Sequence, residues 1–282
     1  MNSHIEDIIG SNNLGKLKSV SPVSGGSIND AFRIETNSNK FFLKTNDASR
    51  FPKMFEMESK GLTILSYSSF VVPQPKVVGQ QGRKQFILLD WIESENPTSN
   101  YWGDYGRSLA DLHSKTSDLF GLDHSNYIGS LSQSNNWEST WADFYREERL
   151  IPQMELAAQS GQLSSKMKNG FEALFVRMEE IYPIERPSLL HGDLWSGNMM
   201  VSSEGKPCIF DPAAYYGHRE MDLAMMALFG GFGKSWVGSY NEMYPLENNW
   251  NERIPIGQLY PLMVHVNLFG GSYARSVETI LQ

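Results

Sequence analysis

The chain has 282 residues, 40% of them hydrophobic, and a formal net charge of −8 at pH 7. This negative charge argues against a general nucleic-acid-binding protein, which needs surplus Lys and Arg to neutralise phosphates. No apolar run approaches the roughly 18 residues that a membrane span requires, and the N-terminus lacks the basic and apolar regions of a signal peptide. We therefore expect a cytoplasmic protein that binds neither nucleic acid nor a membrane.

The first part of the chain reads as a short helix followed by an antiparallel β-sheet. β-prone runs separated by turn residues are typical of consecutive hairpins. Between the third and fourth runs, residues 51–67 have the apolar spacing of a helix, and Pro73 and Pro75 prevent that helix from continuing. The five expected strands are residues 17–23, 28–35, 40–45, 76–79 and 84–89.

A polar stretch at residues 93–98 has the composition of a linker, and the chain beyond it is mainly helical in pattern. The sequence therefore predicts an α+β, bilobal fold. Residues 1–92 would form a small N-lobe with one main helix, and residues 93–282 a larger, mainly helical C-lobe. The expected helices of the C-lobe are residues 101–115, 137–160, 166–181, 220–229 and 255–281, and its β-prone runs are residues 188–190, 199–201 and 208–210.

The strongest chemical motif is residues 191–198 (His-Gly-Asp-Leu-Trp-Ser-Gly-Asn), between two β-prone runs. An Asp followed five positions later by Asn has the spacing of the kinase catalytic loop, His-Arg-Asp-x-x-x-x-Asn. We expect Asp193 to accept the proton of an attacking hydroxyl. Asn198, together with Asp211 after the next run, offers the oxygen ligands that Mg²⁺ prefers. Each residue alone equally suits a turn, but the ordered set indicates phosphoryl transfer.

Lys44 lies on the third expected strand and is the candidate for contacting the phosphates of ATP. Its natural ion-pair partner is a glutamate on the following helix. Glu58 is preferred over Glu56, because only Glu58 lies one helical turn before the apolar Leu62. The alternative for Lys44 is an ordinary solvent-facing strand lysine.

Two further segments are candidates for contacting the nucleotide. The turn Ser24-Gly25-Gly26-Ser27 would let backbone N–H groups approach phosphate oxygens, although Gly-Gly also suits a simple hairpin. The segment Asp90-Trp91-Ile92, directly after the fifth strand, stands where the backbone of a hinge between the lobes would contact adenine. Residues 1–92 are thus expected to form a nucleotide-binding lobe with the hinge at its end.

The sequence indicates the residues that contact the substrate less clearly than those that contact the nucleotide. Trp195 offers a flat aromatic face that suits the C–H surface of a sugar, or it packs in the core. His265 and Asn267, on the expected C-terminal helix, are candidates for contacting substrate. His218 and Arg219 either contact substrate or brace the loop.

Several of these runs, taken together, resemble the fructosamine kinase (ketosamine 3-kinase) family, part of the aminoglycoside-phosphotransferase-like group with a protein-kinase-like fold. Within residues 189–198, the Leu-Trp-Ser-Gly-Asn version of the catalytic loop carries most of the resemblance. The matching runs are residues 23–29, 54–58, 189–198, 211–213, 215–225 and 259–270, which span nearly the whole chain.

The resemblance implies ATP-dependent phosphorylation of a ketosamine at the sugar O3 hydroxyl, with Mg²⁺ as the cofactor ion. The substrate would be a free or protein-bound ketoamine carrying ribulose, erythrulose or fructose. The unstable product would then release its amine, which gives a role in deglycation. It also implies that Asp222 ties down the catalytic loop.

Protein-kinase hallmarks are missing, since Gly192 replaces the Arg of His-Arg-Asp and Pro212-Ala213 replaces Phe-Gly. A small-molecule kinase fits better. The alternatives are a kinase for choline, homoserine or an aminoglycoside, and a pseudokinase that binds ATP without turnover. The oligomeric state stays open.

Overall fold

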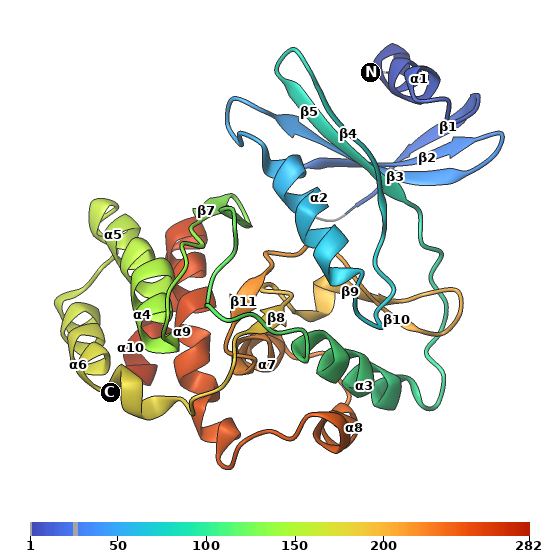
Figure 1. The fold of residues 1–282 in the computed structure, drawn as a ribbon. Helices are drawn as coiled ribbons and strands as arrows, with labels where there is room; N and C mark the ends of the chain where they lie inside the picture. The colour runs from blue at the N-terminus through green and yellow to red at the C-terminus, as the bar shows by residue number, and fades with distance from the viewer. Residues whose placement is uncertain (1, 25–27) are drawn as a thin grey trace.

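The two lobes expected from the sequence are present in the computed structural model, which describes residues 2–24 and 28–282. Figure 1 shows a twisted sheet with two helices above a larger, mainly helical body. The predicted α+β, bilobal fold is therefore confirmed. No helix within residues 2–24 and 28–282 is long and apolar enough to cross a membrane.

The sheet of the N-lobe has five strands in the order β1-β2-β3-β5-β4, and every neighbouring pair is antiparallel. The pairs β1–β2, β2–β3 and β4–β5 join strands that follow one another, whereas β3 pairs with β5 because the chain crosses through α2 before β4. The strands and helices of this lobe are α1 (Asn2–Ser11), β1 (Leu17–Pro22), β2 (Asp30–Thr36), β3 (Lys40–Asp47), α2 (Met54–Leu65), β4 (Pro75–Gln81) and β5 (Lys84–Asp90).

A helix covers each face of this sheet. On β5, Phe86 and Leu88 pack in one cluster with the isoleucines of α1, whereas Ile87 and Leu89 pack in another with the apolar side chains of α2. The alternation follows from the two-residue period of a strand. On β3, Leu43 belongs to the α1 side, so its neighbour Lys44 is directed to the α2 side.

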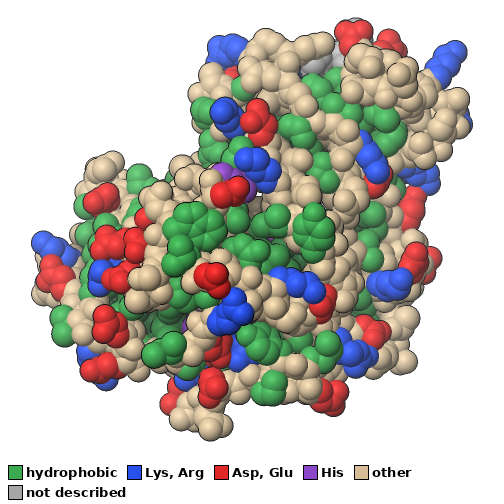
Figure 2. Space-filling view, viewed as in Figure 1, with side chains coloured by type: hydrophobic (Ala, Val, Ile, Leu, Met, Phe, Trp, Pro, Cys, Tyr) green, Lys and Arg blue, Asp and Glu red, His purple; other side chains and the backbone are tan. Residues whose placement is uncertain are grey.

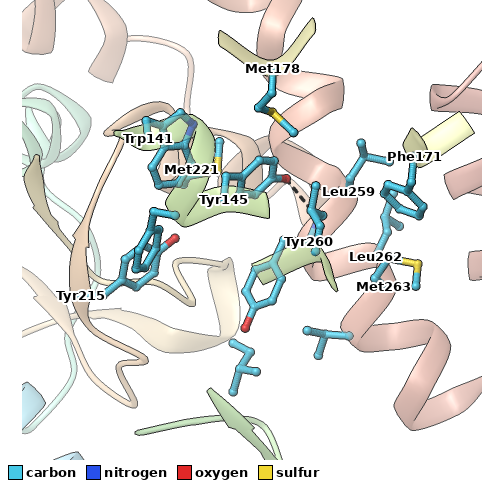
Figure 3. Close-up of a cluster of buried hydrophobic side chains, with 14 of the residues drawn as sticks. Trp141, Tyr145, Phe171, Met178, Tyr215, Met221, Leu259, Tyr260, Leu262 and Met263 are labelled. Atoms are coloured by element: carbon cyan, nitrogen blue, oxygen red, sulfur yellow. Dashed lines mark hydrogen bonds between the residues drawn. The ribbon is translucent and has the colours of Figure 1, made fainter. Parts of the chain in front are cut away.

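The C-lobe is built around the long helix α9. Figure 3 shows the aromatic and aliphatic side chains that fill the core of the C-lobe, among them Trp141, Tyr145 and Tyr215. The Tyr145 hydroxyl donates to the Ile256 carbonyl at 2.7 Å and accepts from the Tyr260 N–H at 3.3 Å. The elements of this lobe are α3 (Tyr101–His113), β6 (Asn126–Ile128), β7 (Leu131–Gln133), α4 (Trp141–Phe144), η1 (Tyr145–Leu150), α5 (Ile151–Gln159), α6 (Ser165–Ile181), β8 (Ser188–Leu190), η2 (Ser196–Asn198), β9 (Met199–Val201), β10 (Pro207–Ile209), β11 (Tyr215–Gly217), α7 (Glu220–Phe229), α8 (Trp236–Met243), α9 (Trp250–Phe269) and α10 (Tyr273–Ile280).

The helix expected at residues 137–160 is wrong in two respects. It begins only at Trp141, because Thr140 caps it by accepting a hydrogen bond from the Asp143 N–H at 3.1 Å. Its middle, η1, is a π-helix that leads into α5 just before Pro152. Proline lacks the N–H for an α-helical bond and crowds the carbonyl four residues earlier, so a wider turn precedes it.

The single helix expected at residues 255–281 is two helices. It begins earlier, at Trp250, and α9 ends at Gly270 with α10 starting at Tyr273. Gly270 and Gly271 have φ angles of +64° and +67°. Glycine adopts this left-handed conformation readily, which reverses the chain although the apolar pattern continues.

The chain between the lobes runs beside β9 of the C-lobe. Ser94 forms an isolated bridge with Ser202, and the Glu95 N–H donates to the Val201 carbonyl at 3.2 Å. The division of the lobes at residues 92 and 93 stays a prediction.

The packing of α3 against α8 depends on one glycine. A Cβ atom on Gly106 would lie 2.1 Å from the Trp236 carbonyl oxygen, closer than atoms can approach. We expect Gly106→Ala to lower the free energy of unfolding by about 1–3 kcal/mol, because the two helices must separate. Urea unfolding monitored by circular dichroism measures this.

Gly238, on α8 itself, is the matched control, because a Cβ there would meet no atom within 4 Å. Gly238→Ala should raise the stability by about 0.5–1 kcal/mol through helix propensity alone. Equal effects of the two substitutions would contradict the packing explanation.

Candidate active site

A lysine and two carboxylates meet where the lobes face each other. The Lys44 ammonium on β3 forms an ion pair with Glu58 Oε1 of α2 at 2.8 Å, and a second, short one with Asp211 Oδ1 of the C-lobe. Burial alone would lower the pKa of Lys44, but the Asp211 and Glu58 carboxylates outweigh burial and raise it. Lys44 is therefore a fixed positive charge. Glu56, the competing glutamate, is exposed.

Asp211 stands in an unusual backbone conformation. Its φ is +56°, in the left-handed region that few non-glycine residues adopt. Directly after it, Pro212 packs against α2 at Gly61, where a Cβ atom would lie only 3.1 Å from the Pro212 ring. The bare backbone at Gly61 thus lets α2, with Glu58, approach the turn that carries Asp211.

A buried carboxylate holds the catalytic loop from below. Asp222, at the start of α7, is fully buried and accepts hydrogen bonds from the His191 N–H at 2.8 Å and the Gly192 N–H at 2.9 Å. His113 Nε2 donates to the same carboxylate at 3.3 Å, and His113 Nδ1 accepts from the Tyr240 hydroxyl at 2.8 Å. Asp222 therefore ties down the loop, as expected.

The turn at Gly192 requires glycine. Its φ is +80°, and a Cβ atom would lie 2.1 Å from the Ala213 carbonyl oxygen. This explains why the Arg of protein kinases is absent here. On its N-terminal side, His191 Nε2 donates to the Phe210 carbonyl at 2.9 Å, and His191 Nδ1 accepts from the Asp193 N–H at 3.2 Å. Burial lowers the pKa of His191, which keeps this neutral tautomer in place.

Asp193 projects from the loop beside Asn198. The Asn198 amide nitrogen donates to the Asp193 carbonyl and to Asp193 Oδ2, both at 2.9 Å. Asp193 is partly exposed, but the protein around it raises its pKa to about 7 through desolvation, against the opposing effect of the Asn198 hydrogen bond. A carboxyl group with this pKa exchanges a proton readily near neutral pH.

Two oxygen donors suit a hard cation at this place. The Asn198 amide nitrogen faces Asp193 and the Asp211 backbone carbonyl, so its amide oxygen is directed elsewhere, and the Asp211 carboxylate is held by Lys44. In the part of the chain that the structure describes, no group of three or more His, Cys, Asp or Glu could hold a metal ion by itself. An amide oxygen and a carboxylate are hard oxygen donors of the kind that Mg²⁺ takes, in small number, before phosphates and water complete its shell.

The expected hinge follows β5 closely. The Asp90 N–H donates to the Gln74 carbonyl at 3.0 Å, and the Trp91 N–H donates to the Lys40 carbonyl at 3.3 Å. Among the described residues, none accepts the Ile92 N–H. The residues Gly25, Gly26 and Ser27, predicted to contact phosphates, lie outside the described residues.

Exposed aromatic rings lead away from the catalytic loop. Trp195 is 38% exposed, so it is not core, and its ring centroid lies 5.8 Å from that of Phe229. The rings of Phe229 and His265 are 5.1 Å apart, and those of His265 and Phe269 are 5.5 Å apart. We call these four side chains the aromatic strip. On the face in Figure 2, hydrophobic side chains gather on the C-lobe just below the N-lobe.

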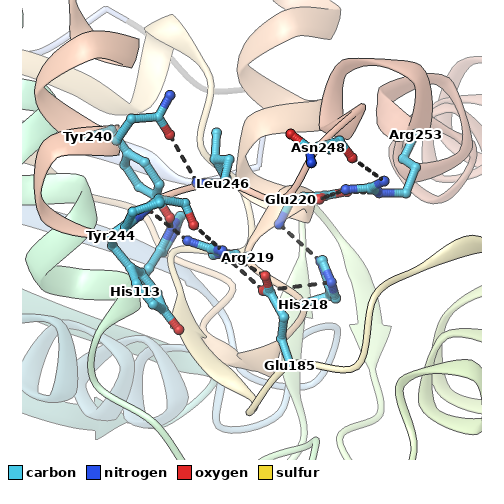
Figure 4. A network of polar contacts seen from close by, with 12 residues as sticks. His113, Glu185, His218, Arg219, Glu220, Tyr240, Tyr244, Leu246, Asn248 and Arg253 are labelled. Carbon is cyan, nitrogen blue, oxygen red and sulfur yellow. Dashed lines mark hydrogen bonds and ion pairs between the residues drawn. The ribbon is translucent and has the colours of Figure 1, made fainter.

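The other substrate candidates point elsewhere. The Asn267 amide donates to the Gln153 carbonyl at 2.9 Å and to the Gln153 side chain at 2.8 Å, which directs it to α5. Figure 4 shows Arg219 in a bidentate ion pair with Glu185, at 2.8 and 2.6 Å. Both His218 and Arg219 are buried, so they brace the start of α7 and do not face substrate.

Sequence reasoning missed Phe229 and Tyr240. Both are ordinary aromatic residues on helices, and no local pattern distinguishes them from core side chains. Only the fold brings Phe229 beside Trp195 and Tyr240 beside His113.

Comparison with known proteins gives a consistent result. A model of the family described as fructosamine kinase matches residues 1–282. A chain from Enterococcus faecium named as a probable ketoamine kinase is 38% identical, over 93% of this chain and 94% of that one. An Arabidopsis thaliana chain named protein-ribulosamine 3-kinase, chloroplastic, is 36% identical, over 94% of this chain and 82% of that one.

Comparison with solved structures points to the same family. A crystal structure from Thermobifida fusca, assigned as a fructosamine-3-kinase, superposes with a TM-score of 0.89 at 32% identity, covering 98% of this chain and 96% of that one. An aminoglycoside phosphotransferase in complex with AMP-PNP and hygromycin B gives a TM-score of 0.66 at 13% identity, covering 98% and 97%. The second likeness concerns the fold alone.

The support under the catalytic loop can be tested through Asp222. We expect Asp222→Asn to lower the free energy of unfolding by about 2–4 kcal/mol. In the variant, one of the two buried backbone N–H groups would face an amide NH₂ group and would lose its hydrogen-bond acceptor. Denaturant titration measures this.

The control is Asp118→Asn, which removes a surface ion pair with Arg186 (3.0 Å) where the Asp118 side chain is 95% exposed. That change should cost less than about 1 kcal/mol. A loss at Asp222 no greater than at Asp118 would show that the buried hydrogen bonds contribute little.

Proposed function

Because this chain belongs to the fructosamine kinase family, we propose that it uses Mg·ATP to phosphorylate the sugar O3 hydroxyl of a ketosamine. The observation that carries the proposal is Asp193, a partly exposed carboxyl group with a pKa of about 7 beside an aromatic surface. The substrate would carry ribulose, erythrulose or fructose on a free or protein-bound amine. The name of the Arabidopsis thaliana relative, a ribulosamine 3-kinase, supports the O3 position.

The nucleotide would lie between the lobes. Glu58 holds the Lys44 ammonium at 2.8 Å, which orients it for phosphate oxygens, and the Ile92 N–H, which no described residue accepts, suits an adenine ring next to Asp90 and Trp91. The sequence adds the turn Gly25-Gly26-Ser27 as a phosphate cradle. Asn198 and Asp211 would hold Mg²⁺, which neutralises charge on the phosphates when bound.

Asp193 would act as the general base. Its carboxylate accepts the proton of the sugar hydroxyl while that oxygen attacks the terminal phosphorus of ATP, and the bond from this phosphorus to the bridging oxygen breaks to release ADP. Asn198 fixes the carboxylate by its 2.9 Å hydrogen bond, and Asp222 fixes the loop backbone. Positioning of this kind supplies most of the catalysis in phosphoryl transfer.

The alternatives are weaker. An aminoglycoside is a polycation and calls for carboxylates on the substrate side, whereas the aromatic strip next to Asp193 consists of Trp, Phe and His side chains. A pseudokinase without turnover is disfavoured because the ion pairs of Lys44 and the hydrogen bonds of Asp193 are intact. Choline and homoserine lack the extended sugar surface that an aromatic strip suits.

The proposal is tested by ADP release in Mg²⁺ buffer with ribulose-lysine, erythrulose-lysine and fructose-lysine, and with choline, homoserine and kanamycin as controls. We expect turnover on at least one ketoamine and none on the controls. Phosphorus NMR of the product then assigns the phosphorylated oxygen. Turnover on a control alone would overturn the substrate class, and ATP binding without any turnover would favour the pseudokinase.

The base is tested with Asp193→Asn, which keeps the size of the side chain and removes its proton-accepting carboxylate. Turnover should fall about 10²–10⁴-fold, the usual contribution of a general base, while the affinity for Mg·ATP stays near wild type. Single-turnover kinetics and nucleotide titration separate the two quantities. Turnover close to wild type would remove Asp193 from this role.

A further inference from the structure

Two adjoining cavities lie beyond the far end of the aromatic strip. One, of about 210 Å³, lies between the lobes and is lined by Ile28, Arg50, Phe51, Ser130, Leu268 and Phe269. The other, of about 350 Å³, lies on the N-lobe. Both are lined by Ile28, Arg50 and Phe51, so they adjoin at these residues, and we call the two together the groove.

The groove connects to the catalytic loop through the aromatic strip. Phe269 lines the smaller cavity and is the last ring of the strip that begins at Trp195, two residues after Asp193. A substrate whose sugar lies at Asp193 would therefore direct the rest of its structure along these rings towards Arg50.

Arg50 is the cation shared by both cavities, and its charge is not neutralised. Within residues 2–24 and 28–282 no carboxylate forms an ion pair with it. The two other basic residues of the larger cavity, Arg83 and Lys84, do not share both properties of Arg50. Arg83 is paired with Asp47 at 2.8 Å, and neither Arg83 nor Lys84 lines the smaller cavity. Of the two acids in the larger cavity, Asp30 and Asp47, neither lines the smaller one.

The turn that carries Arg50 is held rigidly. The Arg50 and Phe51 N–H groups donate to the Asp47 carbonyl at 3.0 and 3.1 Å. The Tyr127 hydroxyl of the C-lobe donates to the Pro52 carbonyl at 3.0 Å. The Arg50 side chain is exposed, its guanidinium lies 5.3 Å from the centroid of the Phe51 ring, and no described residue accepts a hydrogen bond from it. A guanidinium presents paired N–H donors that match a carboxylate in a bidentate manner.

We propose that Arg50 binds a carboxylate on the amine part of the ketoamine substrate. This inference rests on the proposed function and adds the recognition of the amine. The carboxylate has two possible sources, which are the α-carboxylate of a free modified amino acid and an Asp or Glu side chain beside a modified lysine in a protein. Arg50 would thus set substrate preference and leave the chemical step unchanged.

The test compares wild type with Arg50→Gln on matched substrates. The first pair is the ribulosamine of Nα-acetyl-lysine, which has a free carboxylate, and its C-terminal amide, which has none. The second pair is an amidated peptide in which the modified lysine has either Asp or Asn as its neighbour. We expect Arg50→Gln to raise KM about tenfold for a carboxylate substrate, with kcat within about twofold, and to leave the uncharged partner unchanged.

Arg83→Gln is the matched control, because Arg83 lines the same cavity but is paired with Asp47. It should leave the ratio of KM values within each pair unchanged. An effect in the first pair alone identifies the α-carboxylate, and an effect in the second pair alone identifies a neighbouring acidic residue.

Equal KM changes for charged and uncharged substrates would overturn the proposal, because they indicate a structural role for Arg50. No change for either pair would overturn it as well. If wild type turns over no ketoamine, including the uncharged ones, then the proposed function itself has failed and this inference falls with it. Turnover by wild type without an effect of Arg50→Gln contradicts the Arg50 site alone.

Discussion

The bridge from Glu58 through Lys44 to Asp211 is the interaction on which the rest of the site depends. It joins a helix and a strand of the N-lobe to a turn of the C-lobe through one ammonium group. Each carboxylate stabilises the buried charge of Lys44, and Lys44 in turn keeps two acidic groups close together. The bridge therefore adds a charged contact between the lobes at the site, beside the hydrophobic cluster in which α2 and β5 of the N-lobe pack with α3 of the C-lobe.

A second constraint lies under the catalytic loop. The loop follows a tight path, with a left-handed turn at Gly192 and close approach to Ala213, and Asp222 accepts the backbone N–H groups that this path leaves without partners. Hydrogen bonds to a buried carboxylate are strong in such surroundings. Asp193 can therefore be partly exposed to substrate while its backbone stays in one position.

The parts of the molecule that depend on local spacing could be predicted from the sequence. The strands of the N-lobe, the pairing of Lys44 with Glu58 and the loop with Asp193 and Asn198 all follow from short-range patterns. The break between α9 and α10 was missed because the apolar period continues across it, although the pair Gly270-Gly271 is the local signal for a helix end. Contacts such as Trp195 with Phe229 depend on how distant elements pack, which no local pattern encodes.

The close approach of α2 to Pro212 has a consequence for how the protein tolerates mutation. Gly61 lies nearly one helical turn after Glu58 and has no side chain, yet even a methyl group there would meet the stiff Pro212 ring at 3.1 Å. A larger side chain at this position would displace α2 and with it Glu58, and would thereby disturb the position of Lys44. During divergence of the family, this residue, which has no reactive group, is therefore expected to stay small.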